Sequence, residues 1–168
     1  MTSRDGPSEQ RLYFEDLRVG QRFTTASSYT IDETQIKAFA AQFDPQPFHL
    51  DEEAGRATVF GGLVASGWHT AAITMRLIIE GGPRFAGGTL GLGAELSWLK
   101  PVRAGDTLTV RGEVLETTPS SSRRDRGRVN MRTETLNQLG DVVQVCVSKV
   151  MVPCRPTASG GWGSEPSR

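Results

Sequence analysis

The sequence predicts a single α+β domain in which one long helix packs against a curved antiparallel sheet. Two helical patterns lie between about residue 32 and residue 81, and long period-two patterns follow them. Helices that precede a run of strands indicate an α+β fold, because an alternating order would instead favour a parallel sheet. The sheet is therefore expected to wrap around the long helix.

The first helix is predicted to begin near Asp32. Asp32 and Gln35 have the spacing of a capping box, in which each side chain bonds the backbone of the other residue. Pro45 and Pro47 prevent continuation of the helix, so residues 44–49 are expected to form an irregular, stiff loop. The apolar face of this helix is formed by Ile36, Phe39, Ala40 and Phe43.

The second and longer helix is predicted to begin at Ser66 or Gly67. It ends at the segment Gly81–Pro83, which contains two glycines and a proline. Its apolar positions recur at helical spacing, so we expect them to be buried against the sheet. These positions are Trp68, Ala71, Ala72, Met75, Ile78 and Ile79.

Alternating apolar and polar residues predict the strands of the sheet. An early strand is expected at about residues 21–30, and Gly140 favours a hairpin turn within residues 138–141. The long strands are expected at residues 89–99, 107–117, 127–137 and 142–152.

Size and composition limit the domain organisation. A chain of 168 residues is long enough for one domain that folds without disulfides or metal. We expect a disordered leader at residues 1–10, one domain at residues 11–153, and a Gly/Ser/Pro-rich disordered tail at residues 154–168. The leader has no apolar core typical of a signal peptide, so a cytoplasmic location is expected.

Charge and cysteine spacing argue against several classes of partner. Lys+Arg and Asp+Glu both number 19, which disfavours a dedicated nucleic-acid binder or a polybasic membrane surface. No apolar run is long enough to span a membrane. Cys146 and Cys154 do not have zinc-ligand spacing, and we expect neither a metal nor a cofactor.

Asp44 and His49 are the candidate catalytic pair. An acid and a histidine held by a stiff loop can share one water molecule, because the carboxylate accepts a proton and imidazole can accept or donate one. The structural alternative is a loop histidine that bonds the backbone, next to an aspartate that ends a helix.

The segment from Phe43 to Asp51 resembles the signature of the MaoC-like, (R)-specific enoyl-CoA hydratase family, which has the hot-dog fold. The family pattern Asp-x-Asn-Pro-x-His is matched at Asp44, Pro47 and His49. The glycine that opens the long helix, the segment Leu96–Val102 and the Gly105-Asp106 turn continue the resemblance over about residues 11–153. Two positions depart from it: Gln46 replaces the family Asn, and Ser66 replaces a frequent His.

This resemblance implies reversible hydration of a trans-2-enoyl thioester to a 3-hydroxyacyl thioester. Asp44 and His49 would activate water for attack on Cβ, and Gln46 would help to orient the pair. A backbone N–H near Gly67 would stabilise the enolate oxygen, since free N–H groups gather at a helix N-terminus.

Four further residues are weaker candidates for substrate contact. Ser66 and Trp68 lie at the start of the long helix, while Arg123 and Arg124 could bind phosphates of coenzyme A. The structural alternatives are that Trp68 packs in the core and that the arginines belong to a solvated loop.

Two other functions remain open at the level of sequence. Asp44 could activate water toward the thioester carbonyl, as in a hot-dog thioesterase, or the domain could be a non-catalytic acyl-binding module. The expected substrate carrier is coenzyme A or acyl carrier protein. Exposed sheet edges favour a homodimer or a higher homo-oligomer, and the family assembles in this way.

Overall fold

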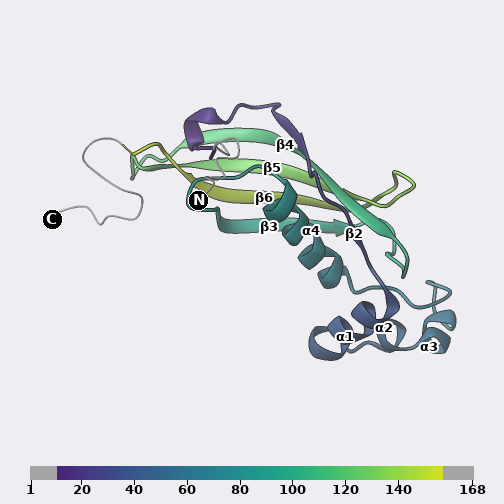
Figure 1. The fold of residues 1–168 in the computed structure, drawn as a ribbon. Helices are drawn as coiled ribbons and strands as arrows, with labels where there is room; N and C mark the ends of the chain where they lie inside the picture. Colours follow the sequence, from purple (N-terminus) through teal and green to yellow (C-terminus); the bar gives the residue numbers. More distant parts are fainter. Residues whose placement is uncertain (1–10, 157–168) are drawn as a thin grey trace, which may run out of the picture.

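The computed structural model describes residues 11–156, which form one curved antiparallel sheet with helices on one side (Figure 1). The sheet has six strands in the order β1-β4-β5-β6-β3, and β2 pairs separately with β4. The strands are β1 (Arg22–Thr24), β2 (Tyr29–Thr30), β3 (Leu90–Trp98), β4 (Thr107–Pro119), β5 (Arg126–Leu136) and β6 (Val142–Pro153).

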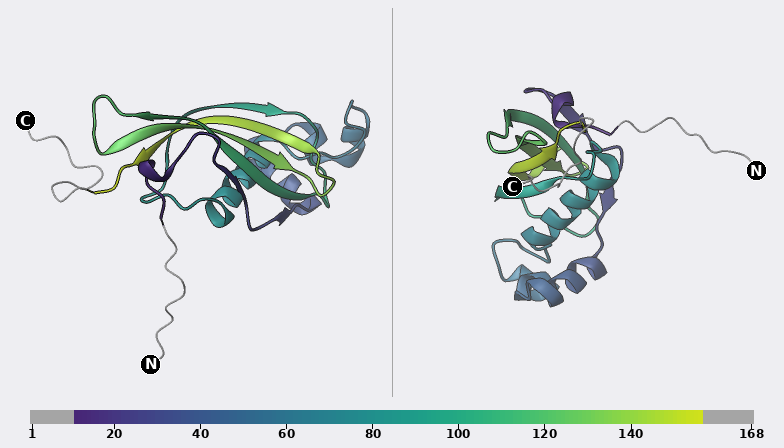
Figure 2. Two further views of the ribbon diagram at one scale, coloured as in Figure 1. Left: turned by 90° about the horizontal axis from the view of Figure 1, so that it is seen from above. Right: turned by 90° about the vertical axis from the view of Figure 1, so that its left-hand side faces the viewer.

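The long helix α4 lies along one face of the sheet, and three shorter helices gather beyond its N-terminal end (Figures 1 and 2). This arrangement confirms the predicted α+β architecture. The helical segments are η1 (Phe14–Asp16), α1 (Glu33–Phe43), α2 (Pro47–Leu50), α3 (Glu52–Arg56) and α4 (Gly67–Gly81).

Local signals predicted most of these elements correctly. Asp32 and Gln35 form the expected capping box at α1, and the hairpin turn at residues 138–141 has Gly140 at a φ of 81°. The prediction of an irregular loop at residues 44–49 was wrong in part, because Pro47 begins α2 instead of preventing helix. Proline fits the first turn of a helix, where its missing N–H has no partner to lose. The early strand is also divided, into β1 and β2.

The predicted burial of the α4 apolar stripe was wrong for its largest members. Trp68, Met75 and Ile79 are 58%, 59% and 63% exposed in the single chain. The face of α4 that contacts the sheet instead contains several polar side chains. Its buried residues are His69, Thr70, Ile73, Thr74 and Leu77.

Hydrogen bonds explain why threonines can occupy the buried face. The Thr74 hydroxyl donates to the Thr70 carbonyl at 2.8 Å and lies 2.6 Å from the Thr135 hydroxyl of β5. Gln144 of β6 donates its amide to Thr74 at 3.1 Å and accepts from the Trp98 indole N–H at 2.9 Å. A buried polar group with a partner avoids most of the cost of leaving water, so this network joins α4 to the sheet.

Two apolar clusters stabilise the two ends of the sheet. One cluster lies beneath α4 and includes Ile36 of α1, Leu77 of α4 and Val110 of β4. The other lies at the opposite end of the strands and includes Val129 of β5 and Val152 of β6. The first cluster therefore supports α1, the helix that ends at Asp44.

The ends of the expected domain meet at the second cluster. Arg155, just after β6, donates to Asp16 of η1 at 2.6 Å. Residues 1–10 of the expected leader and residues 157–168 of the expected tail lie outside the described residues. Within residues 11–156, none of the helices is both long and apolar enough to cross a membrane.

Candidate active site

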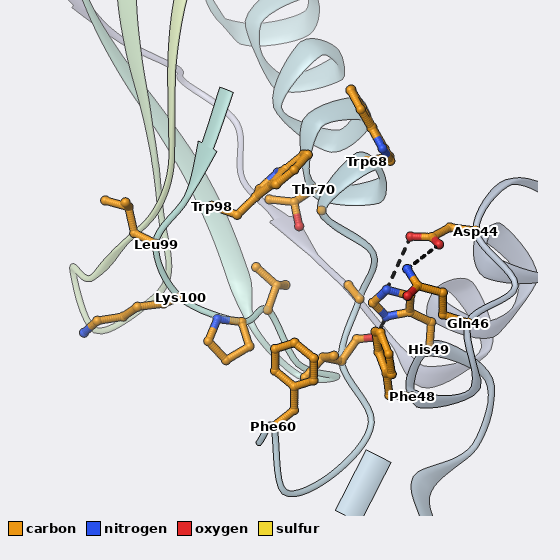
Figure 3. Close-up of a pocket in the computed structure, with 15 residues that line it drawn as sticks. Asp44, Gln46, Phe48, His49, Phe60, Trp68, Thr70, Trp98, Leu99 and Lys100 are labelled. Atoms are coloured by element: carbon orange, nitrogen blue, oxygen red, sulfur yellow. Dashed lines mark hydrogen bonds and ion pairs between the residues drawn. The ribbon is translucent and has the colours of Figure 1, made fainter. Parts of the chain in front are cut away.

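Asp44 and His49 are brought together by a sharp turn between two helices. Asp44 is the residue that ends α1, where its backbone N–H donates to the Ala40 carbonyl at 2.9 Å. His49 lies within α2 and is buried. The Nε2 atom of His49 lies 3.3 Å from Oδ2 of Asp44 (Figure 3).

The hydrogen bond of the other ring nitrogen, Nδ1, determines the tautomer of His49. His49 Nδ1 lies 2.7 Å from the backbone carbonyl oxygen of Val64. A carbonyl oxygen can only accept a hydrogen bond, so Nδ1 carries a proton. In the neutral imidazole, Nε2 is then an acceptor that faces Asp44, and both atoms can receive hydrogen bonds from one water molecule.

Each oxygen of the Asp44 carboxylate has a protein donor. Gln46 Nε2 donates to Oδ1 at 2.8 Å, and the Ser66 hydroxyl donates to Oδ2 at 2.6 Å. These bonds lower the pKa of Asp44 below its ordinary value; the Ser66 bond is the largest cause, while partial burial acts in the opposite direction. Asp44 is therefore held as the carboxylate at neutral pH.

Gly67 opens α4 at a point where there is no room for a side chain. A Cβ atom at Gly67 would lie 2.5 Å from the indole of Trp98. The first N–H groups of a helix have no partner within the helix, and the helix dipole favours negative charge there. Glycine thus permits close packing of Trp98 against the N-terminal end of α4, where the family resemblance implies that the enolate oxygen is stabilised.

A pocket with a volume of about 460 Å³ connects these groups. Trp68 and Trp98 meet edge to face at one side, with ring centroids 5.3 Å apart. Phe48 and Phe60 contribute a second aromatic wall, and Figure 3 shows Lys100 pointing away from the Asp44–His49 pair. The pocket therefore combines apolar walls with one charged, hydrogen-bonded end, as expected for a small-molecule site.

Some residues of the site could not be recognised from the sequence. The Val64 carbonyl that orients His49 has no signal in the sequence, because any residue type supplies a backbone oxygen. Trp98 was part of the motif that resembles the family, and its position in that motif was the available signal for a pocket residue. Ser66 was expected to contact substrate, but its hydroxyl faces Asp44.

Arg123 and Arg124 are not brought to the site by this chain. They follow β4, whose last residue Pro119 pairs with Gly127 of β5. The site lies at the other end of the strands, where Trp98 pairs with Gln144 (Figure 1). The two arginines and the pocket are therefore separated by the length of the sheet.

The groups of the site that can accept and release protons are the Asp44 carboxylate and the His49 imidazole. Within the described range 11–156, no three His, Cys, Asp or Glu side chains gather as a possible metal site. The carboxylate and the imidazole are suited to accept, hold and return the protons of a bound water.

Sequence comparison relates the chain to a family of known proteins. Residues 15–137 match the model of the MaoC like domain family. A protein of Rhodospirillum rubrum named (R)-specific enoyl-CoA hydratase is 34% identical over 145 residues, which is 85% of this chain and 93% of that protein.

Two solved structures have the same fold. A MaoC-like dehydratase from Rhodospirillum rubrum is 55% identical and superposes with a TM-score of 0.84, over 87% of this chain and 99% of that one. The R-hydratase PhaJ1 of Pseudomonas aeruginosa is 31% identical with a TM-score of 0.65, over 90% and 97% of the two chains. The predicted hot-dog fold is therefore confirmed, and the chain belongs to the MaoC-like dehydratase family.

Proposed function

We propose that this hydro-lyase catalyses the reversible hydration of trans-2-enoyl-CoA to 3-hydroxyacyl-CoA. In the hydration direction, the oxygen of one water molecule bonds to Cβ. The Asp44–His49 pair receives a proton from this water, and a proton is delivered to Cα. Dehydration of the 3-hydroxyacyl thioester uses the same groups in reverse order.

The observation that carries this proposal is the pairing of two acceptors, His49 Nε2 and Asp44 Oδ2, at 3.3 Å. Because the Val64 carbonyl holds the proton of His49 on Nδ1, Nε2 is available to take a proton from water. The lowered pKa of Asp44 keeps the second acceptor charged. Both acceptors open onto the same pocket.

The thioester oxygen gains negative charge when the enolate forms. In our proposal the N-terminal end of α4 stabilises this charge through the N–H of Gly67, which lines the pocket together with both members of the pair. The expected role of Gln46 is to orient Asp44 through its amide bond. The choice of a coenzyme A thioester is supported by the name of the Rhodospirillum rubrum relative, an (R)-specific enoyl-CoA hydratase.

A second part of the proposal is that two copies associate through α4 and β3. β3 lies at the edge of the sheet, with β6 as its neighbour, and nearly all of its residues are exposed. Unpaired strand edges and large exposed apolar side chains are features that a partner chain covers. The exposed apolar residues of this surface are Trp68, Met75, Ile79, Leu90, Leu92, Trp98 and Leu99.

The test of the reaction uses loss of the enoyl-thioester absorbance with a series of trans-2-enoyl-CoA substrates, while free-thiol release is followed in parallel. We expect absorbance to fall without thiol release. Asp44→Asn and His49→Ala should each lower kcat/KM by about a hundredfold or more, since each removes a group that handles the proton. Glu53→Gln, an exposed carboxylate of α3, is the matched control with unchanged activity.

The outcomes separate the candidate functions. Release of thiol that depends on Asp44 would replace the hydratase with a thioesterase. Full activity in both variants would exclude the proposed pair. Absence of either reaction with all coenzyme A and carrier-protein thioesters would favour an acyl-binding module.

A further inference from the structure

Ser66 has a fixed hydrogen-bonding role between two parts of the site. It is the N-cap of α4 and is fully buried, with a relative exposure of 0%. Its hydroxyl oxygen accepts from the Trp68 backbone N–H at 3.2 Å, and the same hydroxyl lies 2.6 Å from Asp44 Oδ2. A hydroxyl has one proton to donate, so the proton of Ser66 points to the carboxylate.

This contact joins three elements at one carboxylate. Asp44 ends α1, Gln46 precedes α2 and bonds Oδ1, and Ser66 begins α4 and bonds Oδ2. The oxygen that faces His49 is the one that Ser66 holds. The orientation of the carboxylate therefore depends on a residue that does not line the pocket.

We infer that Ser66 is a positioning residue, whose hydroxyl holds Asp44 ionised and keeps Oδ2 directed at His49. The kinetic consequence of this inference rests on the proposed function. Its effect on Asp44 rests on the hydrogen bond from Ser66. A charge-assisted hydrogen bond of this length stabilises the carboxylate strongly. The bond from Ser66 is also the largest cause of the lowered pKa of Asp44.

The role in positioning can be separated from the role in capping. Glycine is nearly as good an N-cap as serine, so Ser66→Gly removes the hydroxyl with little loss of helix stability. Ser66→Cys keeps a side chain of similar shape with a weaker donor. Thr74→Val removes another buried hydroxyl of α4, one that bonds Thr135 and Gln144 instead of Asp44.

The first measurement is a titration of the Asp44 carboxyl carbon by NMR, from about pH 7 to about pH 2, assigned with Asp44→Asn. We expect the midpoint to rise in Ser66→Gly, to rise less in Ser66→Cys, and to stay unchanged in Thr74→Val. The second measurement is the hydration rate. Ser66→Gly should lower kcat by about ten- to a hundredfold with little change in KM, because the hydroxyl acts on Asp44 and not on substrate.

Each outcome decides the inference. An unchanged titration in Ser66→Gly would overturn it, and so would a rise in KM at constant kcat, which is the signature of a substrate contact. If the wild-type protein shows no hydration while the Asp44 midpoint still rises in Ser66→Gly, the proposed function fails and the role of Ser66 in holding Asp44 stands.

Discussion

The two faces of α4 differ in a way that reverses the usual relation between polarity and burial. The face toward the sheet contains two threonines and a histidine among its buried residues. The opposite face presents Trp68, Met75 and Ile79 to solvent in the single chain. Hydrogen bonds within the chain satisfy the hydroxyl groups of the two buried threonines, Thr70 and Thr74, while Met75 and Ile79 remain exposed among the described residues. This difference supports the proposal that a second copy covers the exposed face.

The largest expected change is dissociation of the proposed dimer by a charge placed on the exposed face of α4. Met75→Asp should convert the proposed dimer to monomer and lower its activity, because a carboxylate buried without a partner at an apolar interface is strongly unfavourable. Light scattering after gel filtration measures the mass directly. Leu139→Asp is the control, because Leu139 is 78% exposed in the β5–β6 turn and belongs to neither α4 nor β3. A wild-type protein that is already monomeric would refute the comparison.

A smaller effect is expected from a cavity on the sheet-facing side. Leu77 is 1% exposed and belongs to the cluster beneath α4. Leu77→Ala should lower the free energy of unfolding by about 2–5 kcal/mol, through lost burial and the cavity that remains. Denaturant unfolding measures this loss, and the oligomeric mass at the same concentration should not change. Dissociation of Leu77→Ala while it remains folded would show that the two faces are not independent.

The smallest effect concerns His69, which is buried and stacks on Phe39 with ring centroids 4.4 Å apart. Burial lowers the pKa of His69, because the charged form loses hydration. As the pH falls, His69 of the unfolded chain therefore binds a proton first, at its ordinary pKa of about 6.5. The stability contributed by neutral His69 is present above that pH, and it is lost as the pH falls below it.

His69→Phe keeps the aromatic stack and removes the titrating group. The difference in unfolding free energy between the variant and the wild type should grow in favour of the variant as pH falls from about 7 to about 5. Parallel curves for the two proteins over this range would show that His69 does not titrate on unfolding.

The comparison of faces also explains what the sequence could and could not predict. Periodicity located α4 correctly, since Gly67 and Gly81 bound the helix in the structure as expected. Periodicity also identified an apolar stripe, but it could not say whether this chain or another one covers the stripe. The long strands were predicted well because alternation is a local signal, as at Val129 and Met131, both of which are buried.

The site was predictable to the extent that it depends on side chains of one short segment. Asp44, Gln46 and His49 were identified from their spacing and from the family pattern, and the structure brings them together. The contact of Ser66 with Asp44 spans 22 positions in the sequence and has no local signal. Arg123 and Arg124 were plausible by charge, but charge does not report the end of the sheet at which a loop lies.

The bond between Arg155 and Asp16 has a practical consequence for handling this protein. It places both limits of the described chain near the end of β6, where Arg126 pairs with Pro153, at the opposite end of the sheet from Trp98 and the pocket (Figure 1). Attachment of the protein to a bead or electrode through either end of the described chain would leave the pocket open to the solution. An immobilised preparation should therefore retain the access of bulky thioesters to the site.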